Sequence, residues 1–305
     1  MFYTLTTNPA VDLTTRSNGL VKKEVNRTFD ASYTANGKGI NVSSVLNHFG
    51  IKSTVLGFFG GFSGEYILSE CQKHGIETSP ITIDDVTRIN IFLNDGTDEY
   101  TLVNQGPVVS KEKQKEFLNL LKGLDSPEYL CISGSLPRGI SPDYYEEIMQ
   151  ICNHMGTKVI LDISNPKLKE LLSYRPFLIK PNDEELYDIF GMATDSKQDI
   201  KSALVKLNQL GAQNILLTLG ERGSYFYNGT DLYQCGTYKV ETLSTACAGD
   251  SFLAAFLSIW TREPNNIECA LKLGAAAGAN AAESAGIGDM KNAPEYAKHI
   301  QVEKI

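Results

Sequence analysis

The sequence has too few and too scattered cysteines and histidines for a disulfide framework or a zinc site. No two cysteines form a C-x-x-C pair, and the four histidines do not cluster near them. Disulfide-rich domains and structural zinc sites both need such side chains at close, regular spacing. We therefore expect reduced thiols and a cytoplasmic protein. The residues concerned are Cys71, Cys131, Cys152, Cys235, Cys247 and Cys269, together with His48, His74, His154 and His299.

The chain also lacks a long hydrophobic run and a positively charged start. Its first residues, MFYTLTTNPAVDL, do not show the basic and then apolar pattern of a secretory signal. The longest apolar runs, such as residues 253–260, are far shorter than the roughly 20 residues that a membrane-spanning helix needs. We expect neither a secretory signal nor a membrane segment.

The chain has fewer basic residues than acidic ones. Lys and Arg total 28 against 36 Asp and Glu, which gives a formal net charge of -8. The overall field therefore repels nucleic acid and anionic membrane surfaces, and neither is expected as a partner. An anionic small molecule would have to be held by local donors.

The sequence has the composition of a globular protein, and strand-like and helix-like segments alternate regularly along it. Hydrophobic residues make up 42% of the 305 residues and charged residues 21%, which suits one large domain over residues 1–305. Short apolar runs predict strands at residues 2–6, 54–59, 129–133, 158–163, 176–180 and 214–219. Amphipathic stretches predict helices near 41–49, 64–74, 111–121, 142–154, 199–210, 250–260 and 267–283. This alternation predicts an α/β fold, with a mostly parallel sheet covered by helices on both faces.

Two regions break the alternation and predict a small separate sheet. Residues 13–35 and 88–104 show strand-like patterning with turn residues such as Asp95-Gly96, and neither region contains a helix-length segment. We expect antiparallel strands here that form a lid on the main body. A further hairpin is predicted over residues 224–235, with Asn228-Gly229 as its tight turn.

The residues just after each predicted parallel strand are polar or glycine-rich, and an open parallel sheet binds its ligands at this edge. Asn182 and Glu185 lie three apart at a helix start, so they could orient metal-bound water, or they could form a capping box. Gly220 could donate its backbone amide to a phosphate or form a simple turn. The residues of interest at this edge are Asp12, Ser135, Lys180, Asn182, Glu185, Thr218, Gly220 and Glu221.

Residues 245–251, TACAGDS, directly precede a predicted helix. Small residues there allow backbone amides to face a ligand, and the helix N-terminus adds positive potential, so the segment could hold a phosphoryl group. Asp250 would face the same site and could accept a proton from an attacking hydroxyl, or it could cap the helix.

A second glycine-rich segment, ANGKGIN at residues 35–41, leads into another predicted helix. It is neither a P-loop nor a G-x-G-x-x-G motif. Its glycines allow close approach to a polar ligand, and Lys38 and Asn41 offer side-chain donors, although a plain connection is an equal alternative. Arg88 opens a lid strand where the lid meets the body, so its guanidinium suits a phosphate on the substrate or a solvated surface position.

The order of these segments along the whole chain resembles that of the pfkB (ribokinase-like) carbohydrate kinases. The resemblance is strongest to the phosphosugar branch of 1-phosphofructokinases and tagatose-6-phosphate kinases. It rests on the joint occurrence of NPAVD, GKGIN, FFGGFSGE, TRIN, QGP, SGSLPRG, LIKPNDEE, TLGERG and CAGDS.

The resemblance implies a ribokinase-like body with a β-sheet lid, ATP and Mg²⁺ as cofactors, and a homodimer through the lid. It leaves a requirement for a monovalent cation such as K⁺ open. It implies that Asp250 is the general base and that Arg88 and Lys38 bind a phosphate already on the sugar. For the sugar, the resemblance implies Asp12, Gly37, Gly39, Asn41 and Ser135. For the anion hole, it implies the segment that begins at Cys247 and continues with Ala248, Gly249 and Asp250. For the nucleotide, it implies Lys180, Thr218, Gly220, Glu221 and Asn280, with Asn182 and Glu185 for water-bound magnesium.

Two positions depart from the family pattern. Asn36 stands where one of two glycines is usual, and Cys247 stands where the anion-hole segment usually begins with glycine. A Cβ at position 247 would restrict the backbone if φ were positive and so reduce or tune activity. Beside a helix N-terminus, the Cys247 thiol is expected to be either somewhat acidified or an inert packing group.

The activity that the resemblance implies is phosphorylation of fructose 1-phosphate to fructose 1,6-bisphosphate. The alternatives are a tagatose-6-phosphate kinase, a 6-phosphofructokinase, a kinase for an unphosphorylated sugar or nucleoside, and a regulator that binds these ligands without catalysis.

Overall fold

A ten-stranded sheet forms the centre of the protein in the computed structural model, which describes all residues 1–305. Its strand order is β14-β13-β12-β11-β10-β9-β8-β1-β4-β5. The strands from β5 to β11 run parallel, and β12, β13 and β14 extend the sheet with antiparallel pairs. The strands are β1 (Phe2–Thr6), β4 (Ser53–Phe59), β5 (Glu77–Thr82), β8 (Tyr129–Ser133), β9 (Lys158–Asp162), β10 (Leu178–Ile179), β11 (Ile215–Thr218), β12 (Ser224–Tyr227), β13 (Leu232–Cys235) and β14 (Val302–Lys304).

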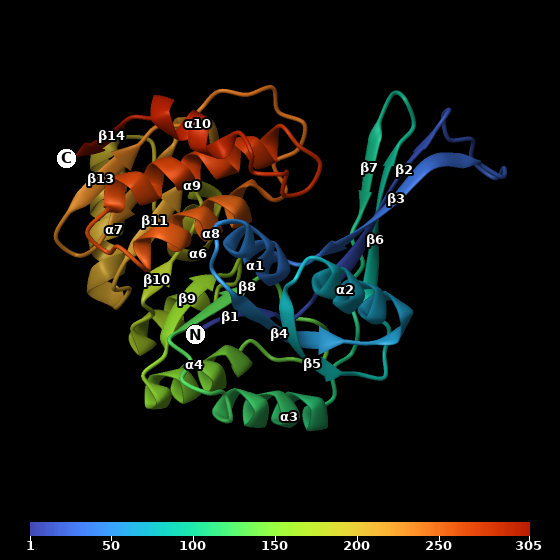
Figure 1. The fold of residues 1–305 in the computed structure, drawn as a ribbon, viewed down its shortest axis with the longest axis horizontal. Coiled ribbons are helices and arrows are strands. Elements are labelled where there is room, and N and C mark those ends of the chain that lie inside the picture. Colours follow the sequence, from blue (N-terminus) through green and yellow to red (C-terminus); the bar gives the residue numbers. More distant parts are fainter.

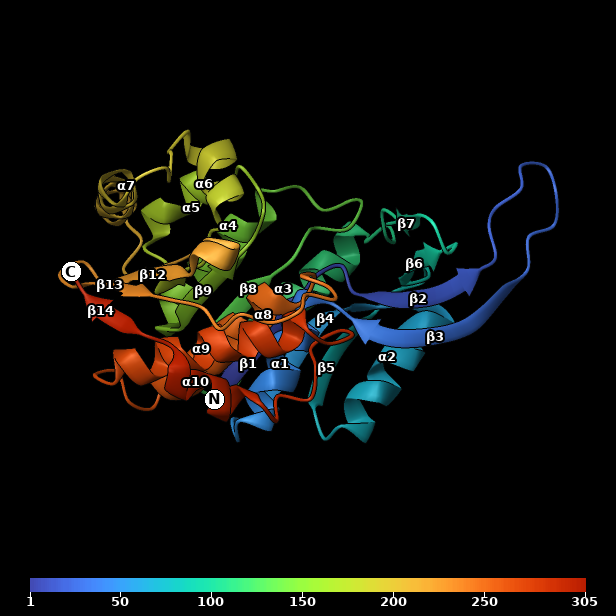
Figure 2. The same ribbon diagram turned by 90° about the horizontal axis from the view of Figure 1, so that it is seen from above.

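Helices cover both faces of this sheet, as Figures 1 and 2 show. One face carries α3 (Lys111–Lys122), α4 (Tyr144–Met155), α5 (Leu168–Leu171), α6 (Asp183–Phe190) and α7 (Lys197–Leu210). The opposite face carries α1 (Lys38–His48), α8 (Ala248–Trp260), α9 (Ile267–Ala282) and α10 (Ala293–His299). The predicted ribokinase-like α/β architecture is therefore confirmed.

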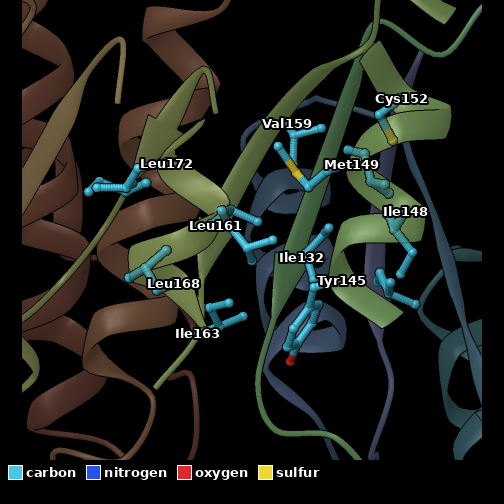
Figure 3. Close-up of a cluster of buried hydrophobic side chains, with 14 of the residues drawn as sticks. Ile132, Tyr145, Ile148, Met149, Cys152, Val159, Leu161, Ile163, Leu168 and Leu172 are labelled. Carbon is cyan, nitrogen blue, oxygen red and sulfur yellow. The ribbon is translucent and has the colours of Figure 1, made fainter. Parts of the chain in front are cut away.

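Side chains of the central strands alternate between two buried clusters, which explains their continuous apolar sequences. In β9, Val159 and Leu161 pack in the cluster with α4, whereas Ile160 packs in the cluster with α8 and α9. Figure 3 shows the first cluster, where Ile132 and Leu161 of the sheet lie beside Met149 of α4. A strand that is buried on both faces needs apolar residues at every position.

A separate four-stranded sheet projects from the body beside α2 (Gly61–Lys73), as Figure 1 shows. Its order is β3-β2-β6-β7, with β2 (Ala10–Ser17), β3 (Thr28–Asn36), β6 (Arg88–Asn94) and β7 (Glu99–Leu102). The outer pairs are antiparallel, but the central pair β2 and β6 is parallel, so the expectation of purely antiparallel strands is wrong. The physical reason is that α1, β4, α2 and β5 lie between β3 and β6 and return the chain as a crossover.

The predicted strands and long helices are present, with helix starts that lie two or three residues earlier than expected at α1, α2, α7 and α8. Apart from Ile40 and Phe62, the added residues are small or polar and carry no apolar pattern. The edge strand β5, ETSPIT, has no continuous apolar run and was not predicted. The hairpin of β12 and β13 is present, with Gly229 at a φ of 91° in its turn. None of the helices is both long and apolar enough to cross a bilayer.

Candidate active site

A cavity of about 450 Å³ opens at the carboxyl edge of the sheet, between β1 and β8. The chain builds β4 and β5 on one side of β1 and β8 to β11 on the other, so this is the point where the strand order reverses. Parallel sheets bind ligands at such a point because the loops after the two strands diverge there. The cavity is lined by Thr6 at the end of β1 and Asn8 after it, and by Ser133 at the end of β8 and Ser135 after it. Residues of the lid sheet and of α8 complete the lining.

Asp250 enters this cavity from the first turn of α8 and is almost fully buried, with 3% of its surface exposed. Asn41 of α1 donates a hydrogen bond to Asp250 Oδ2 over 2.8 Å. The pKa of Asp250 is raised to about 7, mainly by burial and to a lesser extent by repulsion from the Asp162 carboxylate. Its side chain makes no capping hydrogen bond and the N-cap residue is Cys247, so the alternative of a helix cap is wrong. A carboxylate with this pKa suits the role of a general base near neutral pH.

Two backbone amides at the start of α8 have no acceptor in the protein. The first helical hydrogen bond runs from Ser251 N to Cys247 O over 3.0 Å, so the amides of Gly249 and Asp250 lie ahead of it. The Ala248 amide already donates to Thr245 O over 3.2 Å, so this expected member of the anion hole is committed elsewhere. Gly249 also lies close to Lys180, because a Cβ at position 249 would be 3.4 Å from Lys180 Nζ. Free amides beside an ammonium group form a site for an anion.

The carboxylate of Asp162 joins two lysines beneath the site. It is 3.0 Å from Lys180 Nζ and 3.7 Å from Lys38 Nζ, and only 1% of its side chain is exposed. Asp162 is the principal reason that the pKa of Lys38 is raised, so Lys38 stays charged. The sequence reasoning did not select Asp162, although its place as the last residue of β9, at the carboxyl edge of the sheet, is a signal that could have found it.

Asn182 and Glu185 form a capping box at the start of α6. Glu185 N donates to Asn182 Oδ1 over 2.7 Å, and Asn182 N donates to Glu185 Oε2 over 3.0 Å. Ser164 hydrogen-bonds the remaining carboxylate oxygen of Glu185. The capping box that the sequence offered as an alternative is therefore present. A role of this pair in orienting metal-bound water would come in addition to the capping box.

Three of the other residues predicted for the nucleotide lie at the end of β11 or just after it, and Asn280 lies in α9. Thr218 is bridged to Asn182, which places the ends of these strands side by side. Gly220 has a φ of 57° and open space where a Cβ would stand, and Glu221 is exposed. Asn280 does not reach the cavity: it is buried in α9, accepts from Met290 N over 2.8 Å and donates to Glu283 over 2.8 Å.

Residues of the lid sheet and α1 form a chain of hydrogen bonds that leads to Asp250. Asp12 accepts from Asn90 over 2.8 Å and from Asn36, and Asn41 donates to Asn36 Oδ1 over 3.0 Å. Asn36 and Asn90 line the cavity, whereas Asp12 does not. Both asparagines were missed as site residues, although they lie within the segments ANGKGIN and TRIN.

Glycines 37 and 39 differ in what they do. Gly37 lines the cavity with a φ of 154°, where a Cβ would be 2.6 Å from Thr6 Cγ2. Gly39 does not line it, and a Cβ there would be 2.9 Å from Leu5 O, so Gly39 allows α1 to pack on β1. Ser135 lines the cavity and accepts a hydrogen bond from Asn8 over 3.3 Å.

Arg88 is the cation in the cavity that has no carboxylate partner. Its guanidinium donates to Asn8 O and Asn104 O, each over 3.0 Å, and its buried Nε has no acceptor. Burial lowers the pKa of Arg88 from its usual value, but an arginine stays protonated in any folded protein. A desolvated guanidinium without a counter-ion fits an anionic ligand.

Cys247 adopts a φ of -108°, so the side chain at this position causes no backbone strain. Its thiol lies 3.6 Å from Asn41 Nδ2, and burial raises its pKa to about 12. The alternative of an acidified thiol is therefore wrong, and the side chain is an inert packing group.

This fold, with a buried carboxylate beside free amides and lysines, is typical of a phosphotransferase with a hydroxyl acceptor. Residues 5–293 match the model of the pfkB family carbohydrate kinases. The chain belongs to this family, as its sequence motifs predicted.

Curated relatives and solved structures agree with this assignment. The chain is 43% identical to D-tagatose-1-phosphate kinase from Klebsiella oxytoca, over 99% of each chain. It is 32% identical to 1-phosphofructokinase from Bacillus subtilis, over 100% of each chain. It resembles a crystal structure of phosphofructokinase-2 from Escherichia coli in complex with potassium, with a TM-score of 0.90, 24% identity and 98% of each chain covered. At 24% identity, this similarity to phosphofructokinase-2 shows a shared fold and nothing more.

Proposed function

We propose that this protein transfers the terminal phosphoryl group of ATP to the C6 hydroxyl of a ketohexose 1-phosphate. The observation that carries the proposal is one cavity that holds both a buried base, Asp250, and a guanidinium without a counter-ion, Arg88. A kinase for a neutral sugar would leave Arg88 without a partner. We therefore place the sugar's own phosphate at Arg88 and the acceptor hydroxyl at Asp250.

The residues around Asp250 account for the chemistry of transfer. Asp250 accepts the proton from the hydroxyl as its oxygen attacks the terminal phosphorus of ATP and the bond to ADP breaks. The amides of Gly249 and Asp250 receive the charge on the transferred group. Lys38 and Lys180, which Asp162 holds 3.7 and 3.0 Å from its oxygens, add positive charge on both sides.

The family implies a divalent metal with the nucleotide, and we propose Mg²⁺. No group of three or more acidic, histidine or cysteine side chains could hold an ion by itself. That fits Mg²⁺, which binds nucleotide phosphates and keeps several waters. Asn182 and Glu185 would hold those waters, and the ion would neutralise phosphate charge. We include a monovalent cation such as K⁺ in the proposal, and a cytoplasmic location, which the free state of all six cysteines supports.

The choice among ketohexose phosphates is the central test. The sequence favours fructose 1-phosphate, while relatives with 43% and 38% identity are named D-tagatose-1-phosphate kinases. Both compounds carry phosphate on C1, so we propose a 1-phosphate acceptor in place of the 6-phosphates.

An ADP-release assay with D-fructose 1-phosphate, D-tagatose 1-phosphate, the two corresponding 6-phosphates and unphosphorylated fructose measures this choice. We expect kcat/KM for at least one 1-phosphate to exceed that for either 6-phosphate by at least about tenfold, since the wrong phosphate position cannot satisfy both ends of the cavity. Higher kcat/KM for a 6-phosphate or for unphosphorylated fructose would contradict the proposal. Absence of ADP release with every acceptor would favour a non-catalytic regulator.

We also propose that two lids pack together in a homodimer. The lid sheet exposes apolar side chains that a monomer would leave in water, among them Tyr33, Leu102 and Val103, with 58%, 56% and 60% of their surfaces exposed. Apolar patches of this kind mark protein interfaces. In sedimentation equilibrium we expect twice the chain mass for the wild type and the monomer mass for Tyr33→Asp/Leu102→Asp. Leu210→Asp on α7 is the control, and a monomeric wild type at micromolar concentration would contradict the proposal.

A further inference from the structure

Asn36 joins the two halves of the acceptor site through its side-chain amide. On one side its Nδ2 donates to Asp12, which Asn90 also contacts over 2.8 Å. On the other side its Oδ1 accepts from Asn41 over 3.0 Å, and Asn41 donates to the base Asp250 over 2.8 Å. Asn36 therefore lies one side chain away from the base.

The orientation of the Asn36 amide is fixed by its neighbours. The Gly37 backbone N–H, which can only donate, lies 2.6 Å from Asn36 Oδ1. The Asp12 carboxylate, which accepts a hydrogen bond from Asn90 as well, lies at the nitrogen end. A flipped amide would place its NH2 group against two donors and its oxygen against the Asp12 carboxylate. The oxygen is fully used by its two donors, and the second hydrogen on the nitrogen has no acceptor in the protein.

Asn90 repeats this arrangement across the carboxylate. It donates to Asp12 over 2.8 Å, and its oxygen accepts from the Asn104 backbone amide over 3.2 Å. Asn36 and Asn90 line the cavity and Asp12 does not. Asp12 is thus a positioning residue that holds two amides in place, and the groups that face a ligand are amide N–H donors.

We propose that Asn36 determines which C4 epimer of the ketohexose 1-phosphate is accepted. This inference rests on the proposed function, which places the C6 hydroxyl at Asp250 and the C1 phosphate at Arg88. Fructose and tagatose differ only in the configuration of the C4 hydroxyl, two carbons from C6. In the two epimers this hydroxyl points to opposite faces of the ring. A single fixed N–H donor near the base can reach it in one epimer and leaves it unpaired in the other.

The test compares Asn36→Ala with the wild type on D-fructose 1-phosphate and D-tagatose 1-phosphate. We expect kcat/KM for the preferred epimer to fall about 10- to 100-fold, and that for the other epimer to change by less than about threefold. The KM for ATP should stay within about twofold, because Asn36 lies at the sugar end of the cavity. Asn47→Ala, a matched change on the exposed side of α1, should leave both values unaltered.

An equal fall for both epimers would overturn the inference, since it would show that Asn36 only supports Asp12 and Asn41. Unaltered values for both would overturn it as well. If Asn36→Ala is not folded, as judged by its Tm, Asn36→Ser provides the same comparison, because its shorter side chain cannot reach as far into the cavity. Failure of the wild type on both 1-phosphates would instead show that the proposed function is wrong, and the wild-type assay alone reveals it.

Discussion

Replacement of Asp250 with asparagine is expected to lower turnover by a factor on the order of 10²–10⁴ while ATP binding is retained. Asparagine keeps the size of the side chain and a partner for Asn41, which lies 2.8 Å from Asp250 Oδ2, but it cannot accept the proton of the acceptor hydroxyl. Steady-state ADP release measures kcat, and equilibrium titration with ATP measures binding.

The matched control is Asp289→Asn, which changes an exposed aspartate paired with Lys291. The Tm of Asp250→Asn at pH 8 should be no lower than that of the wild type, because the substitution removes a buried charge. Turnover at the wild-type level in this variant would remove the base assignment.

The same residue sets the expected pH dependence. The pKa of Asp250 is raised to about 7, so the carboxylate form that can accept a proton is lost as the pH falls below that value. We expect kcat/KM to level off at higher pH and to decline at lower pH toward a slope of about tenfold per pH unit. The residual activity of Asp250→Asn should lack this decline. A wild-type profile that stays flat from pH 8 to about pH 5 would contradict the assignment.

Replacement of Arg88 with alanine is expected to lower kcat/KM for the sugar phosphate by on the order of 10², because a half-buried charged donor to phosphate is lost. Its guanidinium has a free, buried Nε and no carboxylate partner, so the substitution breaks no ion pair within the protein. The loss should appear mainly as a higher KM for the sugar phosphate, while the KM for ATP is unaltered.

Two further variants show whether the loss of kcat/KM is specific to the guanidinium of Arg88. Arg88→Lys keeps the charge but loses the planar donor pair, so it should recover part of the loss. Arg262→Ala removes an exposed arginine that follows α8 at the end away from the cavity and contacts Gly50, and it should leave kcat/KM unaltered. If Arg88→Ala keeps full kcat/KM for the sugar phosphates, the assignment of an anionic acceptor must be abandoned.

Much of the fold could be predicted because the apolar pattern of each segment reflects its burial. The strands from β1 to β11 that lie inside the sheet have apolar residues on both faces, and the helices that cover them are amphipathic. Edge strand β5 was missed because one side of it has no neighbour and its sequence carries no apolar run. The parallel pairing of β2 and β6 was missed because strand direction depends on the connection between them, which the local pattern does not record.

The sequence also located the main site segments. Asp250, Lys38, Asn41 and Arg88 all line the same cavity at the carboxyl edge of the sheet, as the motifs predicted for a shared site. Cys247 is a different case, because only its observed φ of -108° showed that a residue with a Cβ fits there without strain.

By itself the sequence determined the α/β class, the family and the segments that supply the site, because these depend on periodicity and on residue types at fixed spacing along the chain. Only the tertiary structure decided which donors are committed and which remain free. It showed that the Ala248 amide is already used, that Asp162 ties Lys38 to Lys180, and that Asn36 and Asn90, not Asp12, face the cavity. Hydrogen-bond partners of this kind come from segments far apart in the chain, so no local pattern can specify them.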